Sequence, residues 1–247
     1  MRSLRITCQG WRIGPPEIPI LAVACNPRDL FGEVMATVEN SNVDAGSTFE
    51  RFTPGDVRLL IETYPLAWLE GMDRGRGAML PLIGVFDTND ILVELIGHFP
   101  RSHDLHDALT HNGAAVARFC GPQGYVSPSN AGRRDWAPTW NFCFVEAVLA
   151  VEVSDAFTDT ALDTLVDHME ADRTSPWRKE ELGERLPRMR ERIVGFRARV
   201  ESIRGRFKLG QDETVADLQH IMNSLANDDL AFWMRRMNRN RLPGADA

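Results

Sequence analysis

The chain has 247 residues, of which 43% are hydrophobic and 26% charged, and its formal net charge is −7. This composition is ordinary for a folded globular protein and argues against a disordered chain, while the acidic balance argues against a general nucleic-acid binder. The sequence has no apolar run of the ~20 residues that a membrane-spanning helix needs and no recognisable secretory signal, so we expect a cytoplasmic protein with no membrane partner.

The first 46 residues predict little regular structure. Residues 18–25 form a short apolar run that is typical of a buried strand, but glycines and prolines interrupt the chain before it. Met35 stands just ahead of the first convincing element, so residues 1–34 are either an upstream translation artefact or a real extension packed on the domain edge. We expect an N-terminal extension over residues 1–46 and one domain over residues 47–247.

A helix followed by a series of strands is predicted for the first half of this domain. Thr53 is a good N-cap and Pro54 suits the first helical position, which predicts a helix over residues 54–63. Apolar, β-branched and aromatic runs between turn residues predict strands over residues 66–69, 79–85, 91–96, 114–120 and 141–153. An irregular stretch rich in glycine and proline, residues 121–137, separates the last two strands.

The second half of the domain is predicted to be mainly helical. A helix over residues 158–171 is indicated by apolar residues that share one face, namely Leu162, Leu165, Val166 and Met169. Further helices are predicted over residues 180–196, 212–223 and 225–237, with a short strand over residues 199–203. Strands early in the chain and helices mainly later favour an α+β domain around a barrel or an antiparallel sheet.

Positive charge is concentrated in one segment of the chain. Residues 173–208 contain twelve Lys and Arg against five Asp and Glu, which leaves about −14 for the rest of the chain. Such a segment either faces phosphate groups, as in direct DNA binding, or neutralises the acidic remainder of the fold, and we favour neutralisation. The sequence supports DNA binding only weakly, because no helix-turn-helix pattern is visible.

Histidines and cysteines are the next candidates for chemistry, because GxSxG, HExxH, P-loop and GxGxxG motifs are missing from the sequence. Among the clustered histidines His98, His103, His106 and His111, a metal site is conceivable at His103 and His106, but solvated loop residues are the favoured interpretation. His98 ends an apolar strand, so we expect it to be partly buried. The cysteines, Cys8, Cys25, Cys120 and Cys143, form no CxxC pair, which favours buried free thiols.

Residues 121–129 combine prolines, glycines, two serines and a tyrosine. Such a loop offers backbone amides and hydroxyls to a phosphate or propionate group, although a tight turn with capping serines explains the same composition. The sequence Pro138-Thr139-Trp140-Asn141 follows, in which the indole is able to stack on a planar ring while the amide bonds the edge of that ring. A tryptophan buried in the core is the commoner outcome.

Four short motifs occur in a fixed order along the chain. They are Gly97-His98-Phe99-Pro100-Arg101, residues 121–129, Pro138-Thr139-Trp140-Asn141 and Arg206-Phe207-Lys208-Leu209-Gly210-Gln211-Asp212. Together they resemble the PaiB-type family of FMN-binding negative transcriptional regulators, over a stretch from about Phe49 to Leu225. Ile193-Val194-Gly195-Phe196 also precedes the last motif, as it does in that family.

The resemblance implies a split β-barrel like that of pyridoxamine-phosphate oxidases, with C-terminal helices, in a homodimer that binds FMN in a cleft between subunits, with residues 121–141 lining it. The implied pocket residues are His98, Arg101, Tyr125, Ser127, Ser129, Thr139, Trp140, Asn141, Lys208 and Gln211. Of these, Arg101 and Lys208 suit a phosphate, because charge-assisted hydrogen bonds hold an anion best. We expect Arg101, Ser127, Trp140 and Lys208 to converge on one cavity.

The chain also departs from the family pattern, with Ala78-Met79-Leu80-Pro81 where Thr-His-Leu-Pro is common and Glu146 where a histidine is common. A branch of the family, the haem-dependent piperazate synthases, forms an N–N bond in an N-hydroxylated ornithine. If this chain binds haem b, His98 is the candidate axial ligand and Met79 a conceivable second one. Two functions therefore stand: an FMN-binding regulator or accessory protein without obligatory turnover, or an enzyme, either of this haem type or a flavin oxidoreductase. FMN binding is the leading hypothesis, with no catalytic residue identified.

Overall fold

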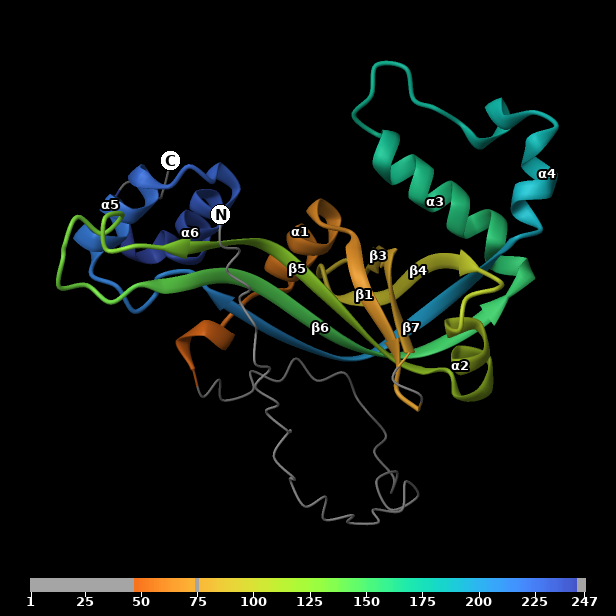
Figure 1. Ribbon diagram of the computed structural model, residues 1–247, viewed down its shortest axis with the longest axis horizontal. Coiled ribbons are helices and arrows are strands. Elements are labelled where there is room, and N and C mark those ends of the chain that lie inside the picture. Colours follow the sequence, from red (N-terminus) through yellow and green to blue (C-terminus); the bar gives the residue numbers. More distant parts are fainter. Residues whose placement is uncertain (1–46, 74–75, 244–247) are drawn as a thin grey trace, which may run out of the picture. The chain divides into compact units, whose positions relative to one another are not determined.

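The computed structural model describes residues 47–73 and 76–243. Within them, seven strands form one antiparallel sheet in the order β2-β1-β5-β6-β7-β4-β3. The strands are β1 Leu66–Gly71, β2 Arg76–Pro81, β3 Ile83–Phe86, β4 Leu92–Pro100, β5 Ala114–Val126, β6 Thr139–Ser154 and β7 Ile193–Lys208. The helices are α1 Pro54–Thr63, α2 Leu105–Asn112, α3 Thr158–Glu170, α4 Arg185–Arg190, α5 Val215–Ser224 and α6 Asp228–Met237 (Figure 1). The expected extension over residues 1–46, with its strand over residues 18–25, lies outside the described residues.

One residue joins the two edges of this sheet. β2 ends at Pro81 and β3 begins at Ile83, although these strands lie at opposite edges of the sheet. Leu82 between them is buried, and its backbone N–H donates to the carbonyl of Pro65 at 2.8 Å. A sheet whose edge strands are consecutive in the chain must roll up into a barrel. The chain is therefore an α+β split barrel, as expected, and the strand predicted over residues 79–85 is divided at the point of crossing.

Alternate residues of the strands fill the barrel interior. β5 and β6 alternate buried and more exposed positions along their length, as strands with one face on a core do. The largest fully buried side chains are Phe99, Phe119, Phe196, Phe207 and Trp233. The rings of Phe207 and Trp233 stack at a centroid distance of 5.7 Å, which joins the end of β7 to α6. Full burial of one such side chain stabilises the fold by about 1.5–3 kcal/mol.

A buried ion pair joins α1 to α6. Thr53 caps α1, because its Oγ1 accepts a hydrogen bond from the backbone N–H of Asp56 at 3.2 Å. The Asp56 carboxylate, which is 2% exposed, accepts from the N–H of Thr53 at 2.8 Å and from Nε of Arg236 at 2.6 Å. The predicted cap and helix are confirmed, and the capping carboxylate also fixes α6.

The helix predicted over residues 180–196 is wrong beyond Arg190. A short 3-10 turn over Lys179–Leu182 and the six-residue α4 are followed by β7. Gly183, at φ 54, interrupts the helical path, and the run that begins at Ile193 pairs with β4. The strand predicted over residues 199–203 is only the middle of β7. Likewise β5 extends to Val126, into the stretch predicted to be irregular. The remaining predicted helices are confirmed as α3, α5 and α6 to within a few residues.

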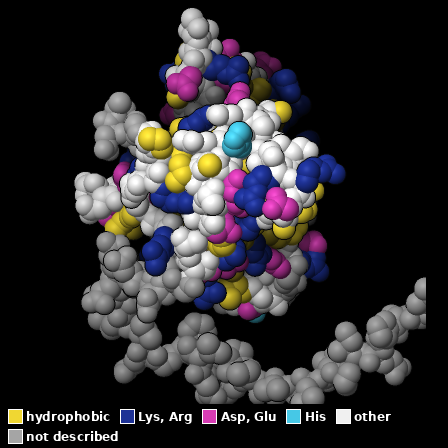
Figure 2. All heavy atoms as spheres, turned by 90° about the vertical axis from the view of Figure 1, so that its left-hand side faces the viewer, with side chains coloured by type: hydrophobic (Ala, Val, Ile, Leu, Met, Phe, Trp, Pro, Cys, Tyr) yellow, Lys and Arg dark blue, Asp and Glu magenta, His cyan; other side chains and the backbone are white. Residues whose placement is uncertain are grey.

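The basic segment that follows α3 folds back along the acidic face of that helix. Ion pairs join Arg178 to Asp167 at 3.7 Å, Lys179 to Asp163 at 2.6 Å and Arg190 to Asp159 at 2.7 Å. At the end of the molecule that carries α5 and α6, basic and acidic side chains are interspersed (Figure 2). Both observations support the neutralising role that the charge pattern favours. None of the described helices is long and apolar enough to cross a membrane.

Candidate functional site

Most of the expected site residues gather where the ends of β5 and β7 lie beside the start of β6. Tyr125 pairs with Trp140 across β5 and β6, and Lys208 on β7 pairs with Phe142 on β6. Tyr125, Thr139, Trp140 and Lys208 are called the strand-end cluster below. Ser127 and Ser129 follow directly in the loop after β5.

The aromatic and basic groups of the strand-end cluster are open to solvent. The rings of Tyr125 and Trp140 lie 6.0 Å apart and are 53% and 51% exposed. The Lys208 ammonium donates to the Thr139 hydroxyl and approaches the carbonyl oxygen of Trp140 at 3.4 Å. It also lies 5.8 Å from the centre of the Phe49 ring. Trp140 is thus a surface residue, and the alternative that it belongs to the core is wrong.

The loop after β5 is braced against α5. The N–H of Ser129 donates to the Ser127 hydroxyl at 3.2 Å, and the N–H of Ser127 donates to the Asn130 side chain at 3.0 Å. The Asn130 amide in turn donates to the Ser224 hydroxyl at 3.0 Å. The serines therefore shape the turn beside the strand-end cluster, as in the capping interpretation.

Asn141 and Gln211 use their polar groups inside the fold. Asn141 is buried, and its amide donates to the sulfur of Met234 on α6 at 3.6 Å. Gln211 accepts from the N–H of Leu209 at 2.8 Å and donates to the carbonyl of Phe207 at 2.6 Å. The bonds of Gln211 fix the backbone on either side of Lys208. The bond of Asn141 fixes the residue that follows Trp140.

His98 and Arg101 lie at the other end of β7. His98 pairs with Gly195 near the start of that strand, whereas Lys208 is its last residue. Because β7 has 16 residues and a strand rises about 3.3 Å per residue, its ends are on the order of 50 Å apart along the strand. Within one chain, the expected convergence of Arg101, Ser127, Trp140 and Lys208 on one cavity is therefore not met.

His98 is half-buried beside the start of α3. A Cβ on its partner Gly195 would lie 2.5 Å from backbone atoms of Phe157, so the chain that enters α3 packs directly on this pair of strands. His98 Nδ1 is buried and has no hydrogen-bond partner among the described residues. Burial lowers the pKa of His98 below 6.5, which favours the neutral imidazole that a metal ligand requires. Arg101 is engaged by Asp155 and by the carbonyl of Glu191.

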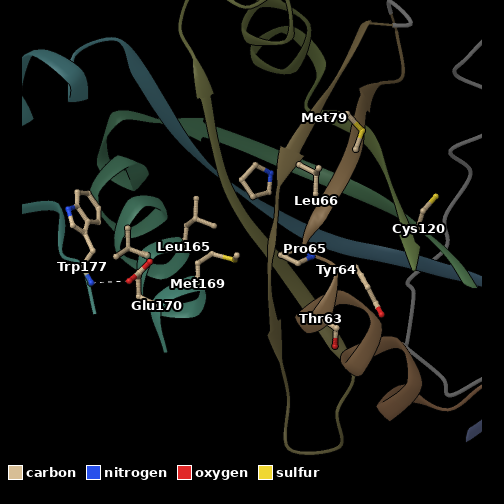
Figure 3. A pocket seen from close by; sticks show the side chains of 12 residues that line it. Thr63, Tyr64, Pro65, Leu66, Met79, Cys120, Leu165, Met169, Glu170 and Trp177 are labelled. Carbon is tan, nitrogen blue, oxygen red and sulfur yellow. Dashed lines mark hydrogen bonds between the residues drawn. The ribbon is translucent and has the colours of Figure 1, made fainter. Parts of the chain in front are cut away.

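A large cavity opens between α3 and the elements α1, β1 and β2 (Figure 3). Its volume is about 760 Å³. It is lined by Thr63, Tyr64, Pro65, Leu66, Met79, Pro81, Cys120, Leu165, Val166, Met169, Glu170 and Trp177. Burial, with a smaller effect of nearby Asp229, raises the pKa of Tyr64 to about 12, so this phenol is neutral. We call this space the α3 cavity.

The α3 cavity was not predicted from the sequence. Its α3 wall contains Leu165, Val166 and Met169, whose spacing indicates a helix face but does not reveal whether the face packs on the core. Its opposite wall includes Met79 and Pro81, which stand where the resembled family has Thr-His-Leu-Pro.

The remaining histidines and cysteines of the described chain have structural surroundings and no chemical role that the structure indicates. No group of three or more potential metal ligands occurs in residues 47–73 and 76–243. His103 Nδ1 accepts from the N–H of Leu105 at 3.1 Å at the start of α2. Cys143 is buried, and burial raises the pKa of its thiol, whereas Cys120 is exposed, against expectation. Cys8 and Cys25 lie outside the described residues.

Comparison with known proteins finds similarity to a family model, to a curated protein and to solved structures. The family model described as "Putative FMN-binding domain" matches residues 46–202. Protease synthase and sporulation protein PAI 2 of Bacillus subtilis (strain 168) is 25% identical over 147 residues, which are 58% of this chain and 70% of that protein. The flavocytochrome Anf3 from Azotobacter vinelandii matches with a TM-score of 0.44 and 18% identity, over 65% of this chain and 69% of that one. An FAD- and haem-binding protein from Mycobacterium smegmatis matches with a TM-score of 0.44 and 16% identity, over 63% and 71%.

Proposed function

Because the chain belongs to this FMN-binding domain family, we propose that it binds FMN at the strand-end cluster. One observation carries the proposal: the ammonium of Lys208 contacts the hydroxyl of Thr139 and the backbone carbonyl of Trp140, whose half-exposed ring lies 6.0 Å from that of Tyr125. A phosphate needs a cation and hydroxyl donors, and a flavin ring needs a flat apolar surface. The donor set therefore fits the cofactor.

Each residue of the cluster has a separate task. Lys208 supplies the charge for the phosphate, and Thr139 holds the flexible lysine in place. Trp140 and Tyr125 offer a stacking surface, whose backbone is fixed by the bonds of neighbouring Asn141 and Gln211. FMN, when bound, supplies electron and hydride transfer.

We further propose that the protein acts as a homodimer, with the His98 and Arg101 group of one subunit near the strand-end cluster of the other. Support comes from large apolar side chains left uncovered on the sheet, including Trp68, Val93 and Trp140. Sedimentation equilibrium tests this part, since a monomer at the concentrations where FMN binds contradicts it. On this scheme the residue 1–46 segment is an extension of a single domain over residues 47–247.

An FMN titration with a matched pair of variants tests the site. The chain has only two lysines, Lys208 in the cluster and Lys179 on the α3 side. Lys208→Met should weaken FMN binding by roughly 10–100-fold, the loss of a charge-assisted hydrogen bond, whereas Lys179→Met should leave affinity unchanged. Trp140→Ala should weaken binding by roughly 2–10-fold and leave the melting temperature unchanged. Equal affinity of the two lysine variants would reject the cluster as the FMN site.

Haem b binding is the second candidate function, and the unpartnered Nδ1 of His98 favours it. In this case His98 would hold the iron. The corresponding reaction would be formation of an N–N bond, as in the piperazate synthases. Wild type and His98→Ala, each mixed with haemin, distinguish the candidates. A Soret band that disappears in the variant supports haem binding, whereas no Soret band in either protein rejects it.

The biological role follows from the cofactor that is found. With FMN bound and no turnover, we propose a regulator or flavin-dependent accessory protein; with turnover of a reduced nicotinamide, a flavin oxidoreductase. Direct DNA binding is the less supported mode of regulation, because much of the basic segment is paired with acidic residues of the same chain. A gel-shift titration against the chain's own upstream DNA tests it.

A further inference from the structure

We propose that the α3 cavity is a binding site for a small, flat, apolar ligand that is neutral or carries one positive charge. Its volume of about 760 Å³ falls within the roughly 300–1,000 Å³ of pockets that hold small molecules. The site is separate from the strand-end cluster, and it does not depend on FMN binding.

The walls of the cavity are apolar on both sides. α3 buries only Thr158 and Ala161, both in its first turns, so its later apolar residues face the cavity instead of packing on the core. Met169 on α3 and Leu66 and Met79 on the opposite wall remain about half exposed. Figure 3 shows Leu165 and Met169 on one side and Leu66 and Met79 on the other, with the space between them. Two apolar walls held apart in this way favour an apolar ligand between them.

The charge of the lining selects against anions. Glu170 is the one charged residue among those that line the cavity, in the described part of the chain. Its carboxylate accepts from the backbone N–H of Trp177 at 3.0 Å, which holds the indole at the cavity rim (Figure 3). The other oxygen of Glu170 lies 3.7 Å from Nε of the exposed Arg173, which is not part of the lining. An anionic ligand would therefore find no cation in the lining and would have to compete with Glu170 for Arg173, whereas a cationic group would find a carboxylate and an aromatic ring together.

The outer rim is held by surface ion pairs. Trp177 lies just before Arg178 and Lys179, which pair with Asp167 and Asp163 on the exposed side of α3. Exposed ion pairs contribute at most about 1 kcal/mol each, so the rim can adjust to a ligand at low cost. The segment after α3 thus closes the cavity without sealing it.

Two dyes that share a ring system test the proposal. N-phenyl-1-naphthylamine is neutral, and 8-anilino-1-naphthalenesulfonate adds one sulfonate to the same rings. We expect saturable fluorescence enhancement by the neutral dye at one site per chain and at least 10-fold weaker binding of the sulfonate. Glu170→Gln should narrow this difference, because it removes the repelling charge and keeps an acceptor for Trp177.

A matched pair of variants locates the dye. Val166→Trp fills the cavity and should weaken dye binding at least 10-fold, whereas Val215→Trp, at an exposed position on α5, should leave it unchanged. If Val166→Trp does not reach the wild-type melting temperature, Met79→Trp on the opposite wall replaces it. Unsaturable binding, equal affinity for both dyes, or unchanged binding in the cavity variant would overturn the proposal.

FMN serves as the competitor that separates the two sites. We expect FMN to leave the bound dye in place, and Val166→Trp to bind FMN as wild type does. Stoichiometric displacement of the dye by FMN would overturn the separate site while supporting FMN binding. Dye binding in a chain that binds no FMN would instead contradict the proposed function and leave this inference standing.

Discussion

The helices at the two ends of the sheet are held by different forces. α5 and α6 pack on the barrel through fully buried side chains such as Leu218, Leu230 and Trp233. α3 meets the barrel through its buried first turns, Thr158 and Ala161, and through His168, whose Nε2 lies 2.8 Å from the carbonyl oxygen of Glu62. The segment that follows α3 is held to it by ion pairs such as the exposed one between Arg178 and Asp167. α5 and α6 therefore depend on buried apolar area, whereas the segment after α3 depends on charge.

This difference bears on the two candidate sites. The strand-end cluster lies against the α5 and α6 region, where the stacking of Phe207 on Trp233 fixes the strand just before Lys208. A site that must hold a phosphate in one geometry benefits from such support. The α3 cavity has a wall held by weak, adjustable contacts, which suits apolar ligands of variable shape. A rigid polar site and an adjustable apolar one thus share a single barrel.

Replacing one tryptophan in each region should give the largest difference in the free energy of unfolding. Trp233 is 1% exposed, and Trp233→Ala should lower the free energy of unfolding by about 3–5 kcal/mol, because a large cavity replaces the ring. Trp177 is 38% exposed, and Trp177→Ala should cost well under 1 kcal/mol. Urea denaturation of both variants measures the difference. Similar losses in the two variants would show that the α3 side is packed as firmly as the α6 side.

Breaking an ion pair should also cost more free energy of unfolding on the α6 side than on the α3 side. Asp56→Asn removes the buried carboxylate that pairs with the partly buried Arg236 and should cost about 3 kcal/mol. Asp163→Asn breaks the pair with Lys179 at a half-exposed carboxylate and should cost about 1 kcal/mol. The denaturation midpoints of the two variants provide the measurement. A larger loss in Asp163→Asn would reverse the comparison.

The parts of the fold that local sequence determines were predicted well. Thr53 and Pro54 mark the start of α1 because a cap and a first-turn proline act within four residues. The start of β7 was missed, because its pairing with β4 joins residues almost a hundred positions apart, and the charged background of the segment suits a helix equally well. The crossing at Leu82 was missed because a buried residue between two strands continues the apolar pattern.

The motifs predicted which residues lie together in the sheet better than they predicted where the side chains point. The ordered motifs brought Tyr125, Trp140 and Lys208 together correctly, since neighbouring strand ends meet in the sheet. The motifs did not show that Asn141 points inward to Met234, because that orientation depends on the distant α6. They placed Arg101 with Lys208, whereas the length of β7 keeps the two apart in one chain.

A third test uses the pH dependence of stability at His98, beside the start of α3. The folded-state pKa of His98 lies below 6.5, so the unfolded chain binds a proton more readily than the folded one. Above pH 6.5 the imidazole is neutral in both states, and the free energy of unfolding is at its full value. As pH falls from 6.5 toward the folded-state pKa, only the unfolded chain gains the proton, so the free energy of unfolding decreases. His98→Gln should therefore lose less stability than wild type between pH 7.5 and about 5.5.

The matched control for this test is His111→Gln, at an exposed position at the end of α2. It should keep the wild-type dependence on pH, because it leaves His98 in place. Urea midpoints at the two pH values are the measurement. If His98→Gln and His111→Gln behave alike, His98 is not held neutral beside α3.

The smallest expected effect is that of salt, and it separates the two regions without any mutation. At 1 M ionic strength the screening length falls to about 3 Å, so exposed pairs such as Arg178 with Asp167 and Arg190 with Asp159 weaken. Hydrogen exchange of residues 172–184 should then accelerate by roughly 2–5-fold, the equivalent of a loss of about 0.4–1 kcal/mol. Exchange in α6 should stay constant or slow, since apolar burial does not depend on screening. Faster exchange in α6 than in residues 172–184 would mean that charge, not apolar packing, holds the end of the barrel that carries the strand-end cluster.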